Sequence, residues 1–416
     1  MHPMLKPALR RAWRERQSVQ FGVTPAHAVT LGPVDTATGA LLELLDGTRG
    51  LPLLREEARA IGLPEGHSDA LVQRLTAAGL LDDPTAGGPA AEALRARAGA
   101  VDRLRPDLAA LSVVHPEPGA GMRRLAARRA VRIQIRGAGR VGAAVAALLS
   151  ASGVGRIEVL DGGRVEPGDV SPGGLAPETV GERREAAARR RVREVAPIPP
   201  QRSTGAMAGR AAGGAVTGKG VAGGGAMARE GGPGAAARAG GEPSGSGEGG
   251  LSLIIVCPRD GLMAYAPDPA PASDWIATGT PHLYAGVIEA TGMVGPLVLP
   301  GGTGCAGCLE LARTERDPGW PRLLAQWRSG GRRAPVPAGD TALAAAVAGM
   351  AAAHALSFLD GELPTSAGAR WETSLPLLDW RSERIAPHPR CVCGSAGKSE
   401  VHDTSGLEPS HETMAG

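Results

Sequence analysis

Apolar and polar positions along the first eighty residues predict a small domain of two strands and three helices. Residues 18–31 contain two short runs of β-forming side chains on either side of Thr24-Pro25, which predicts two strands joined by a turn. Three predicted helices follow, and each one ends at a glycine. The first covers ALLELLDG, is capped by Asp35 or Thr36 and ends at Gly47. The second spans about 51–61 and ends before Gly62, and the third spans about 67–78 and ends before Gly79. With the apolar pair Leu80-Leu81, these elements predict a winged-helix-like module over residues 1–83. A helical cap on the next domain fits the same pattern.

The pattern changes near residue 131, where strand and helix periods begin to alternate. A strand at 131–135, a helix at 141–151 and a strand at 156–160 predict one β-α-β unit with parallel strands and a right-handed connection. Further elements are expected as helix 176–194, strands 251–257, 283–289 and 293–299, and helices 305–314, 321–328 and 341–359. This alternation indicates an α/β domain over residues 131–395.

Three segments lack the apolar side chains that a packed core needs. Residues 84–130 have the composition of a linker, with a helix near 91–97. Residues 201–250 consist mainly of glycine, alanine and serine, so burial cannot offset the entropy of ordering, and we expect a disordered insertion. A disordered tail is expected over 396–416.

Charge and hydropathy indicate which partners and which cellular compartment to expect. The net charge of +3 over 416 residues gives no broad basic surface, so we expect no nucleic-acid partner. The first residues lack the apolar core of a signal peptide, and 342–359 is alanine-rich, contains His354 and lies between aspartates, which favours a buried helix over a membrane span. We therefore expect a cytoplasmic protein without a membrane partner.

A glycine motif follows the strand at 131–135. Gly137 permits a tight turn, Gly139 lets backbone N–H groups approach a phosphate, and Gly142 lets the helix pack closely on the sheet. Asp161 ends the next strand 24 positions after Gly137, near the spacing of a carboxylate that accepts ribose hydroxyls. The motif indicates a nucleotide site. Used alone, it also fits an NAD-dependent oxidoreductase or a simple tight turn.

Four of the five cysteines form two close pairs. The pairs are Cys305 with Cys308 and Cys391 with Cys393. Four thiolates fill a tetrahedral zinc site and leave no open position, so the pattern predicts structural zinc. His388 is an alternative ligand, and Cys257, alone in an apolar strand, is interpreted as a buried apolar residue.

Two stretches resemble the ThiF/MoeB/HesA family, the relatives of ubiquitin-activating enzymes, including its actinobacterial members. They are RGAGRVGAAVAALLSASGVGRIEVLDGGRV and MVGPLVLPGGTGCAGCLELARTERDPGWP. The resemblance covers 131–200 and 251–394. It implies a Rossmann-like, mostly parallel sheet of the ThiF type with helices on both faces, a zinc site and a homodimer. The stretch LLELLDGTRGLPLLREEA is similar to PqqD-like peptide-recognition modules.

The resemblance implies an activity. Enzymes of this family are adenylyltransferases, in which the C-terminal carboxylate of a peptide or of a ubiquitin-like or sulfur-carrier protein attacks the α-phosphate of MgATP. The products are an acyl adenylate and pyrophosphate. A PqqD-like module beside such a domain implies a peptide substrate and a place in ribosomal peptide modification.

The same resemblance assigns roles to individual residues. Those implied to bind the nucleotide are Gly137, Gly139, Arg140, Gly142, Asp161 for the ribose, and Asp169, where the family tends to have asparagine. Arg184 stands where the family has a catalytic lysine, and Asp260 is near the acid that helps to hold magnesium. Gly163 replaces a second acid and Pro172 a catalytic arginine. These departures support an alternative: a catalytically degenerate scaffold that binds a leader peptide for a partner cyclodehydratase.

Overall fold

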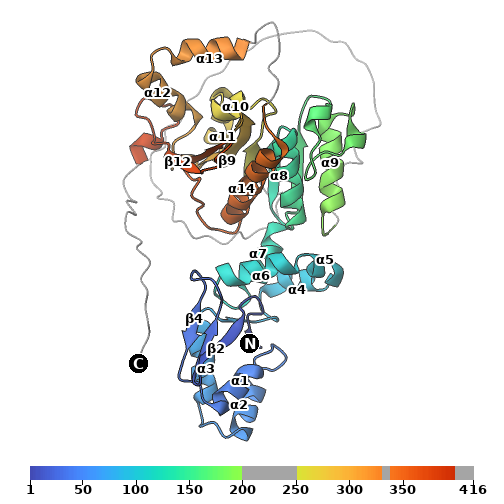
Figure 1. Cartoon of the computed structure of the whole chain (residues 1–416), viewed down its shortest axis with the longest axis vertical. Coiled ribbons are helices and arrows are strands. Elements are labelled where there is room, and N and C mark those ends of the chain that lie inside the picture. The colour runs from blue at the N-terminus through green and yellow to red at the C-terminus, as the bar shows by residue number, and fades with distance from the viewer. Residues whose placement is uncertain (199–250, 330–337, 399–416) are drawn as a thin grey trace, which may run out of the picture. The chain divides into compact units, whose positions relative to one another are not determined.

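The N-terminal residues form a small sheet and three helices in the computed structural model, which describes residues 1–198, 251–329 and 338–398 (Figure 1). The strands are β1 (Met4–Leu5), β2 (Arg11–Glu15), β3 (Ser18–Phe21), β4 (Val29–Leu31) and β5 (Leu81–Asp82), and the helices are α1 (Thr36–Glu43), α2 (Leu51–Ala60) and α3 (His67–Ala77). Strands β2, β3 and β4 form one antiparallel sheet, and β1 pairs with β5.

The sequence predicted most of these N-terminal elements. Both strands within 18–31 and all three helices are confirmed, and the Asp35 carboxylate caps α1 by accepting the backbone N–H of Thr38 at 2.7 Å. Strand β2 was missed because all five of its residues are exposed, which leaves no alternation of buried and exposed positions.

Residues 88–128 are helical, which corrects the prediction of a linker with a single helix. The four helices are α4 (Gly88–Arg95), α5 (Ala98–Arg103), α6 (Arg105–Val114) and α7 (Ala120–Arg128). Leu94, Leu104 and Leu125 lie at the centre of their shared core. The core is small because each helix is short and contributes at most two large apolar side chains.

A seven-stranded sheet forms the centre of the second region, in the order β12-β11-β10-β9-β8-β6-β7. Its strands are β6 (Arg132–Arg136), β7 (Arg156–Leu160), β8 (Leu253–Val256), β9 (His282–Ile288), β10 (Thr291–Val298), β11 (Ala369–Ser374) and β12 (Arg381–Arg384). Strands β7, β6, β8 and β9 pair in parallel, and β10, β11 and β12 continue the sheet antiparallel. Five of the seven strands therefore run in one direction, and the predicted mostly parallel α/β sheet is confirmed.

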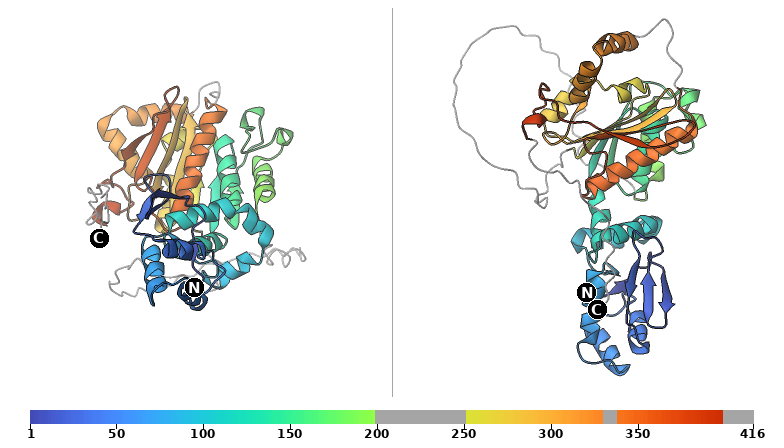
Figure 2. Two further views of the ribbon diagram at one scale, coloured as in Figure 1. Left: turned by 60° about the horizontal axis from the view of Figure 1, so that its bottom comes forward. Right: turned by 60° about the vertical axis from the view of Figure 1, so that its left-hand side comes forward.

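Helices cover both faces of this sheet (Figure 2). Helices α8 (Arg140–Ala151), α9 (Arg184–Val195) and α14 (Thr341–Leu359) bury one face with Ile133, Ile135 and Leu253. The other face is covered by α11 (Ala270–Ala277) and α12 (Ala306–Arg316), with the short α10 (Leu262–Tyr265) packed against β9. Helix α13 (Trp320–Ser329) follows α12.

Helix α14 is long and apolar enough to cross a membrane, and it is the only such helix in the described ranges. In the fold it packs through small side chains against α8, β9 and β10. The buried residues are Leu343, Ala344, Val347, Ala348, Ala351, Ala352 and Ala355. These contacts confirm the interpretation of 342–359 as a packed helix.

Two predictions fall partly or wholly outside the described residues. The insertion 201–250 lies outside them, and so do residues 399–416 of the predicted tail. The described part of the predicted tail is ordered, because Ser395–Lys398 forms a short 3-10 helix. The helix expected at 176–194 starts at Arg184 instead, after a separate 3-10 turn at Pro177–Thr179.

The order of the strands places a switch point at β6. From β6 the chain passes through α8 to β7 on one side, and it later returns to β8 on the other side of β6. Connections that diverge in this way leave a crevice at the carboxyl ends of the two central strands, which is where open α/β sheets bind ligands.

Candidate functional site

The glycine loop lies at this crevice, between the end of β6 and the start of α8. Gly137 has φ +100°, and an added Cβ would lie 2.0 Å from the carbonyl oxygen of Cys257. A Cβ at Gly142 would lie 2.0 Å from the carbonyl oxygen of Gly137. No side chain caps α8 at Gly139, so the first N–H groups of the helix are open to an anion.

A cavity of about 270 Å³ lies in front of this helix end. Its lining comes from the loop, the ends of β8 and β9, the turn before Asp169 and the start of α14: Gly139, Arg140, Val141, Gly168, Asp169, Cys257, Pro258, Arg259, Val287, Gly339 and Ala344. Among the residues predicted to bind the nucleotide, Gly139, Arg140 and Asp169 line the cavity directly.

Asp161 joins the glycine loop to the end of β7. Its Oδ2 accepts the backbone N–H of Ala138 at 2.8 Å, and its Oδ1 accepts the N–H of Gly163 at 2.8 Å and Nε–H of Arg184 at 3.0 Å. Burial raises the pKa of Asp161, but these hydrogen bonds outweigh it and hold the pKa below its usual value. Asp161 is therefore a carboxylate at neutral pH. Its ribose-binding role stays a prediction.

Two arginines share the buried carboxylate of Asp169, which is 2% exposed. Arg184 donates Nη1–H to Oδ2 at 3.3 Å, and Arg259 donates Nε–H to Oδ1 at 2.6 Å. Arg259 also pairs with Glu166 at 2.5 Å. Burial lowers the pKa of Arg259, but its bonds to these two carboxylates raise it above the usual value. Positive and negative side chains therefore alternate along the wall of the cavity, from Arg184 through Asp169 and Arg259 to Glu166.

Arg140 crosses from the helix end to the opposite wall. Its Nε–H donates to the carbonyl oxygen of Gly168 at 2.6 Å, and its Nη1 donates to the carbonyl oxygen of Gly339 at 3.0 Å. Arg140 therefore holds the turn before Asp169 and the segment before α14 close to the glycine loop.

Sequence reasoning missed Arg259 and chose its neighbour Asp260. Asp260 is exposed, accepts the backbone N–H of Leu262 at 3.0 Å, and is not among the residues that line the cavity. Arg259 lies three positions after the end of the buried strand β8, and the loop at this carboxyl end faces the crevice, which is the signal that could have identified it. Pro172 is exposed in the turn that follows Asp169.

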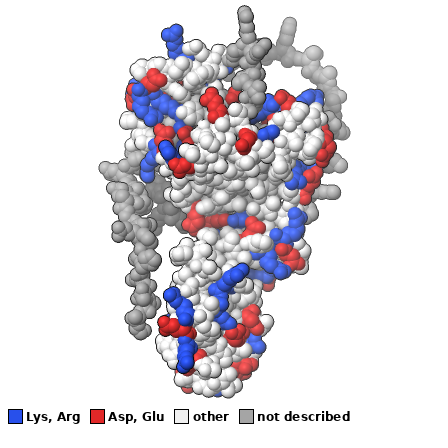
Figure 3. Space-filling view, viewed as in Figure 1, with Lys and Arg blue, Asp and Glu red and all other residues white. Residues whose placement is uncertain are grey.

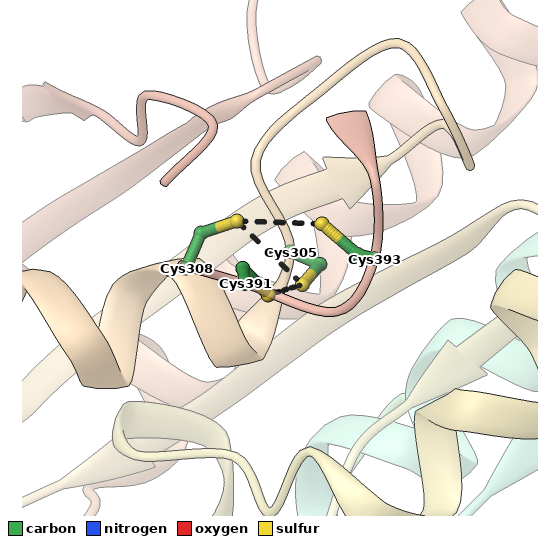
Figure 4. A group of neighbouring side chains, drawn as sticks. All are labelled: Cys305, Cys308, Cys391 and Cys393. Carbon is green, nitrogen blue, oxygen red and sulfur yellow. Dashed lines mark hydrogen bonds between the residues drawn. The ribbon is translucent and has the colours of Figure 1, made fainter. Parts of the chain in front are cut away.

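The four paired cysteines meet at a second site, at the N-terminus of α12 (Figure 4). Their sulfur atoms all lie within 4.8 Å of one another. Cys305 Sγ is 3.8 Å from that of Cys308 and 3.6 Å from that of Cys391, and Cys308 and Cys393 are 3.6 Å apart. Four thiolates about 2.3 Å from one zinc ion have sulfur atoms about 3.8 Å apart, so the arrangement fits tetrahedral zinc.

Neither the imidazole ring of His388 nor the thiol of Cys257 joins the cluster. His388 directs Nε2 at Glu315 Oε2, 3.1 Å away, and only its backbone N–H contacts Cys308 Sγ. Cys257 is buried after β8, and burial raises the pKa of its thiol to about 12. Both observations favour a site of four thiolates.

A glycine loop at the switch point of a mostly parallel sheet defines a Rossmann-like α/β fold. Residues 114–199 match the model of the ThiF family. No curated protein matches the sequence.

Solved structures with the same fold include MccB of E. coli in complex with MccA-N7isoASN, with a TM-score of 0.61, 14% identity, and coverage of 95% of this chain and 100% of MccB. E. coli MccB with ATP gives a TM-score of 0.61 at 14% identity and covers 94% and 99% of the two chains. The heterocyclase TruD gives 0.56 at 15% identity, over 95% of this chain and 43% of TruD. At this level of identity, the similarity establishes the fold.

Proposed function

We propose that this protein is an ATP-dependent adenylyltransferase that activates the C-terminal carboxylate of a peptide or small carrier protein. The observation that carries the proposal is the open N-terminus of α8, which faces the cavity and has one sterically required glycine before it, Gly137, and one in its first turn, Gly142. The match to the ThiF family model supports it. So do the solved structures of MccB with ATP and with N-formylated MccA, which have the same fold.

The proposed reaction is in-line transfer of AMP. A carboxylate oxygen forms a bond to the α-phosphorus, the bond from that phosphorus to the bridging oxygen breaks, and pyrophosphate leaves. Such a reaction needs positioning and charge neutralisation more than covalent help from the protein. The N–H groups at the start of α8 and the guanidinium groups of Arg140 and Arg259 would supply positive charge at the cavity.

We assign structural zinc to the four cysteines. A full set of thiolates leaves no position for a substrate, so this zinc would stabilise the fold without entering the reaction. It would tie the segment after β12 to the start of α12.

The N-terminal module is assigned to peptide binding, on its similarity to PqqD-like modules and on the MccB structures that contain MccA. We further propose a cytoplasmic homodimer with neither a nucleic-acid nor a membrane partner. Figure 3 shows lysine and arginine interspersed with acidic residues over the face in view, with no broad basic area.

Pyrophosphate exchange tests the proposal. The full-length protein, with ATP, labelled pyrophosphate and a candidate precursor peptide, should form labelled ATP only when the peptide has a free C-terminal carboxylate. Asp161→Asn should abolish exchange, because it removes the charge that holds Arg184 and the glycine loop. Glu158→Gln, earlier on β7, is the matched control and should keep it. Failure to bind ATP, together with absence of exchange, would reject the proposal.

The scaffold alternative has its own support. Asp161 and Arg184 form an ion pair with each other, so neither charge is free for a nucleotide. The exposed Pro172 supplies no positive charge. A scaffold should bind a leader peptide in calorimetry and give no heat with ATP, whereas an adenylyltransferase should bind both.

A further inference from the structure

Within the part of the chain that the structure describes, Asp169 is the acidic residue that lines the cavity, and other groups engage both its oxygens. Asp169 gives one oxygen to Arg259 and the other to Arg184 and the backbone N–H of Glu166. Both oxygens of Asp161 are likewise bonded. A magnesium ion requires oxygen ligands about 2.0–2.1 Å away in an octahedron, so it would have to displace a guanidinium group and remain beside another.

Asp260, implied by the family resemblance to help hold magnesium, does not fit that role in this structure. Its side chain is exposed and accepts the N–H of Leu262 at the start of α10. The residue that reaches the cavity from this segment is the preceding one, Arg259, which is a cation instead of an anion.

Arg259 is held in a position suited to a phosphate. Its Nε is fixed by the buried Asp169, and its Cγ would lie 3.4 Å from a Cβ at Gly139, beside the start of α8. Its Nη2 bonds Glu166, whose side chain is 58% exposed. An ion pair to so exposed a partner contributes little, so a phosphate oxygen can replace Glu166 at small cost while Asp169 keeps the guanidinium oriented.

We propose that this pocket neutralises the nucleotide phosphates with Arg259 and supplies no carboxylate ligand to magnesium, so that nucleotide binding does not depend on the metal. This inference rests on the proposed ATP site. It assigns the charge-neutralising role at the end of β8 to a guanidinium group and gives Arg259 a phosphate-binding function.

Calorimetry of the full-length protein with ATP, in magnesium chloride and in EDTA, tests the inference. The two dissociation constants should agree within about threefold, since no protein-bound metal is gained or lost. Arg259→Asp should weaken binding in EDTA by about tenfold or more, and magnesium should restore part of it, because the variant carries a carboxylate in place of the cation. Arg259→Gln should weaken binding in both buffers.

Arg381→Asp is the matched control, because Arg381 is exposed on β12, pairs with Asp379 and is not among the residues that line the cavity. It should bind ATP like the unchanged protein in both buffers. A wild-type affinity that falls more than about tenfold in EDTA would overturn the inference and leave the ATP site intact. So would unchanged binding by both Arg259 variants. Absence of ATP binding in both buffers would instead reject the proposed function itself, and the inference with it.

Discussion

At the scale of single residues, Gly163 and Arg184 depend on each other. A Cβ added at Gly163 would lie 2.1 Å from Arg184 Nη2, well inside van der Waals contact. The guanidinium cannot move freely, because it donates Nε–H to Asp161 and Nη1–H to the carbonyl oxygen of Arg164. The missing side chain at position 163 therefore makes room for the guanidinium group of Arg184.

This dependence gives the first prediction. Gly163→Ala should push the guanidinium away from Asp161 and lower the free energy of unfolding by about 1–2 kcal/mol, as overpacking does. Urea unfolding at pH 7 measures the loss. Gly162→Ala is the matched control and should change little, because a Cβ at Gly162 has nothing within 4 Å.

A second substitution separates crowding from other causes. Lysine has no planar guanidinium, so Arg184→Lys should relieve the clash, and the Gly163→Ala, Arg184→Lys double variant should be more stable than the sum of the single effects predicts. Strictly additive effects would show that the two residues do not compete for space.

The residues of the candidate site differ in how far the sequence could predict them. Gly137 and Gly142 stand in a recognisable motif, and the structure gives the reason: each position leaves no room for a Cβ. The four cysteines could be predicted as a site because they occur as two closely spaced pairs. Arg259 belongs to no recognisable sequence motif, because its place in the site depends on contacts with Asp169 and Glu166, about 90 positions away.

At the scale of elements, the four cysteines join two segments distant in the sequence. Cys305 and Cys308 lie at the start of α12, and Cys391 and Cys393 lie in the turn after β12. Apart from this site and the bonds of His388 and Arg390 to Glu315, little holds the end of the described chain.

The second prediction is that the purified protein contains about one zinc ion per chain. Cys308→Ser should remove the metal, lower the melting temperature and make the segment after β12 sensitive to protease, because one lost thiolate opens the tetrahedral site. Metal analysis and limited proteolysis measure the two effects. Cys257→Ala is the control and should keep its zinc. A protein that folds fully without zinc, with the same melting temperature, would contradict the prediction.

Elements with a strong apolar period could be predicted from the sequence, and edge elements could not. The unit of β6, α8 and β7 was located to within a residue or two, since buried side chains set its period. Strand β12 (RSER) has no apolar residue and lies at the edge of the sheet, so it carried no signal. Helix α5 buries none of its residues and α6 buries only Leu111 and Ser112, so neither gives a clear apolar period.

At the scale of the whole molecule, the pairing of distant segments decides the fold. A parallel β-α-β unit follows from local rules, but the antiparallel half of the sheet rests on β10 pairing with β11 more than seventy positions later. A buried ion pair also joins segments that are distant in the sequence. Arg128 at the end of α7 donates two hydrogen bonds to Asp360 at the end of α14, with N···O distances of 2.9 and 2.6 Å. No sequence spacing indicates that contact.

The last prediction concerns this pair. The side chains of Arg128 and Asp360 are only 6% and 5% exposed, so removing one partner leaves the other as an unpaired buried charge. Arg128→Met or Asp360→Leu alone should lower the free energy of unfolding by about 3–5 kcal/mol, whereas the double variant should recover much of the loss because no unpaired charge remains. Urea unfolding of all four proteins gives the coupling energy.

The exposed pair of Arg381 and Asp379 provides the comparison that decides whether burial is the cause. These side chains are 81% and 64% exposed, so the same single substitutions there should cost about 1 kcal/mol or less. If the Arg128 and Asp360 variants cost no more than this, the pair is solvated in the folded protein. The helices of residues 88–128 would then be held to the sheet domain by apolar contacts and not by this charge pair.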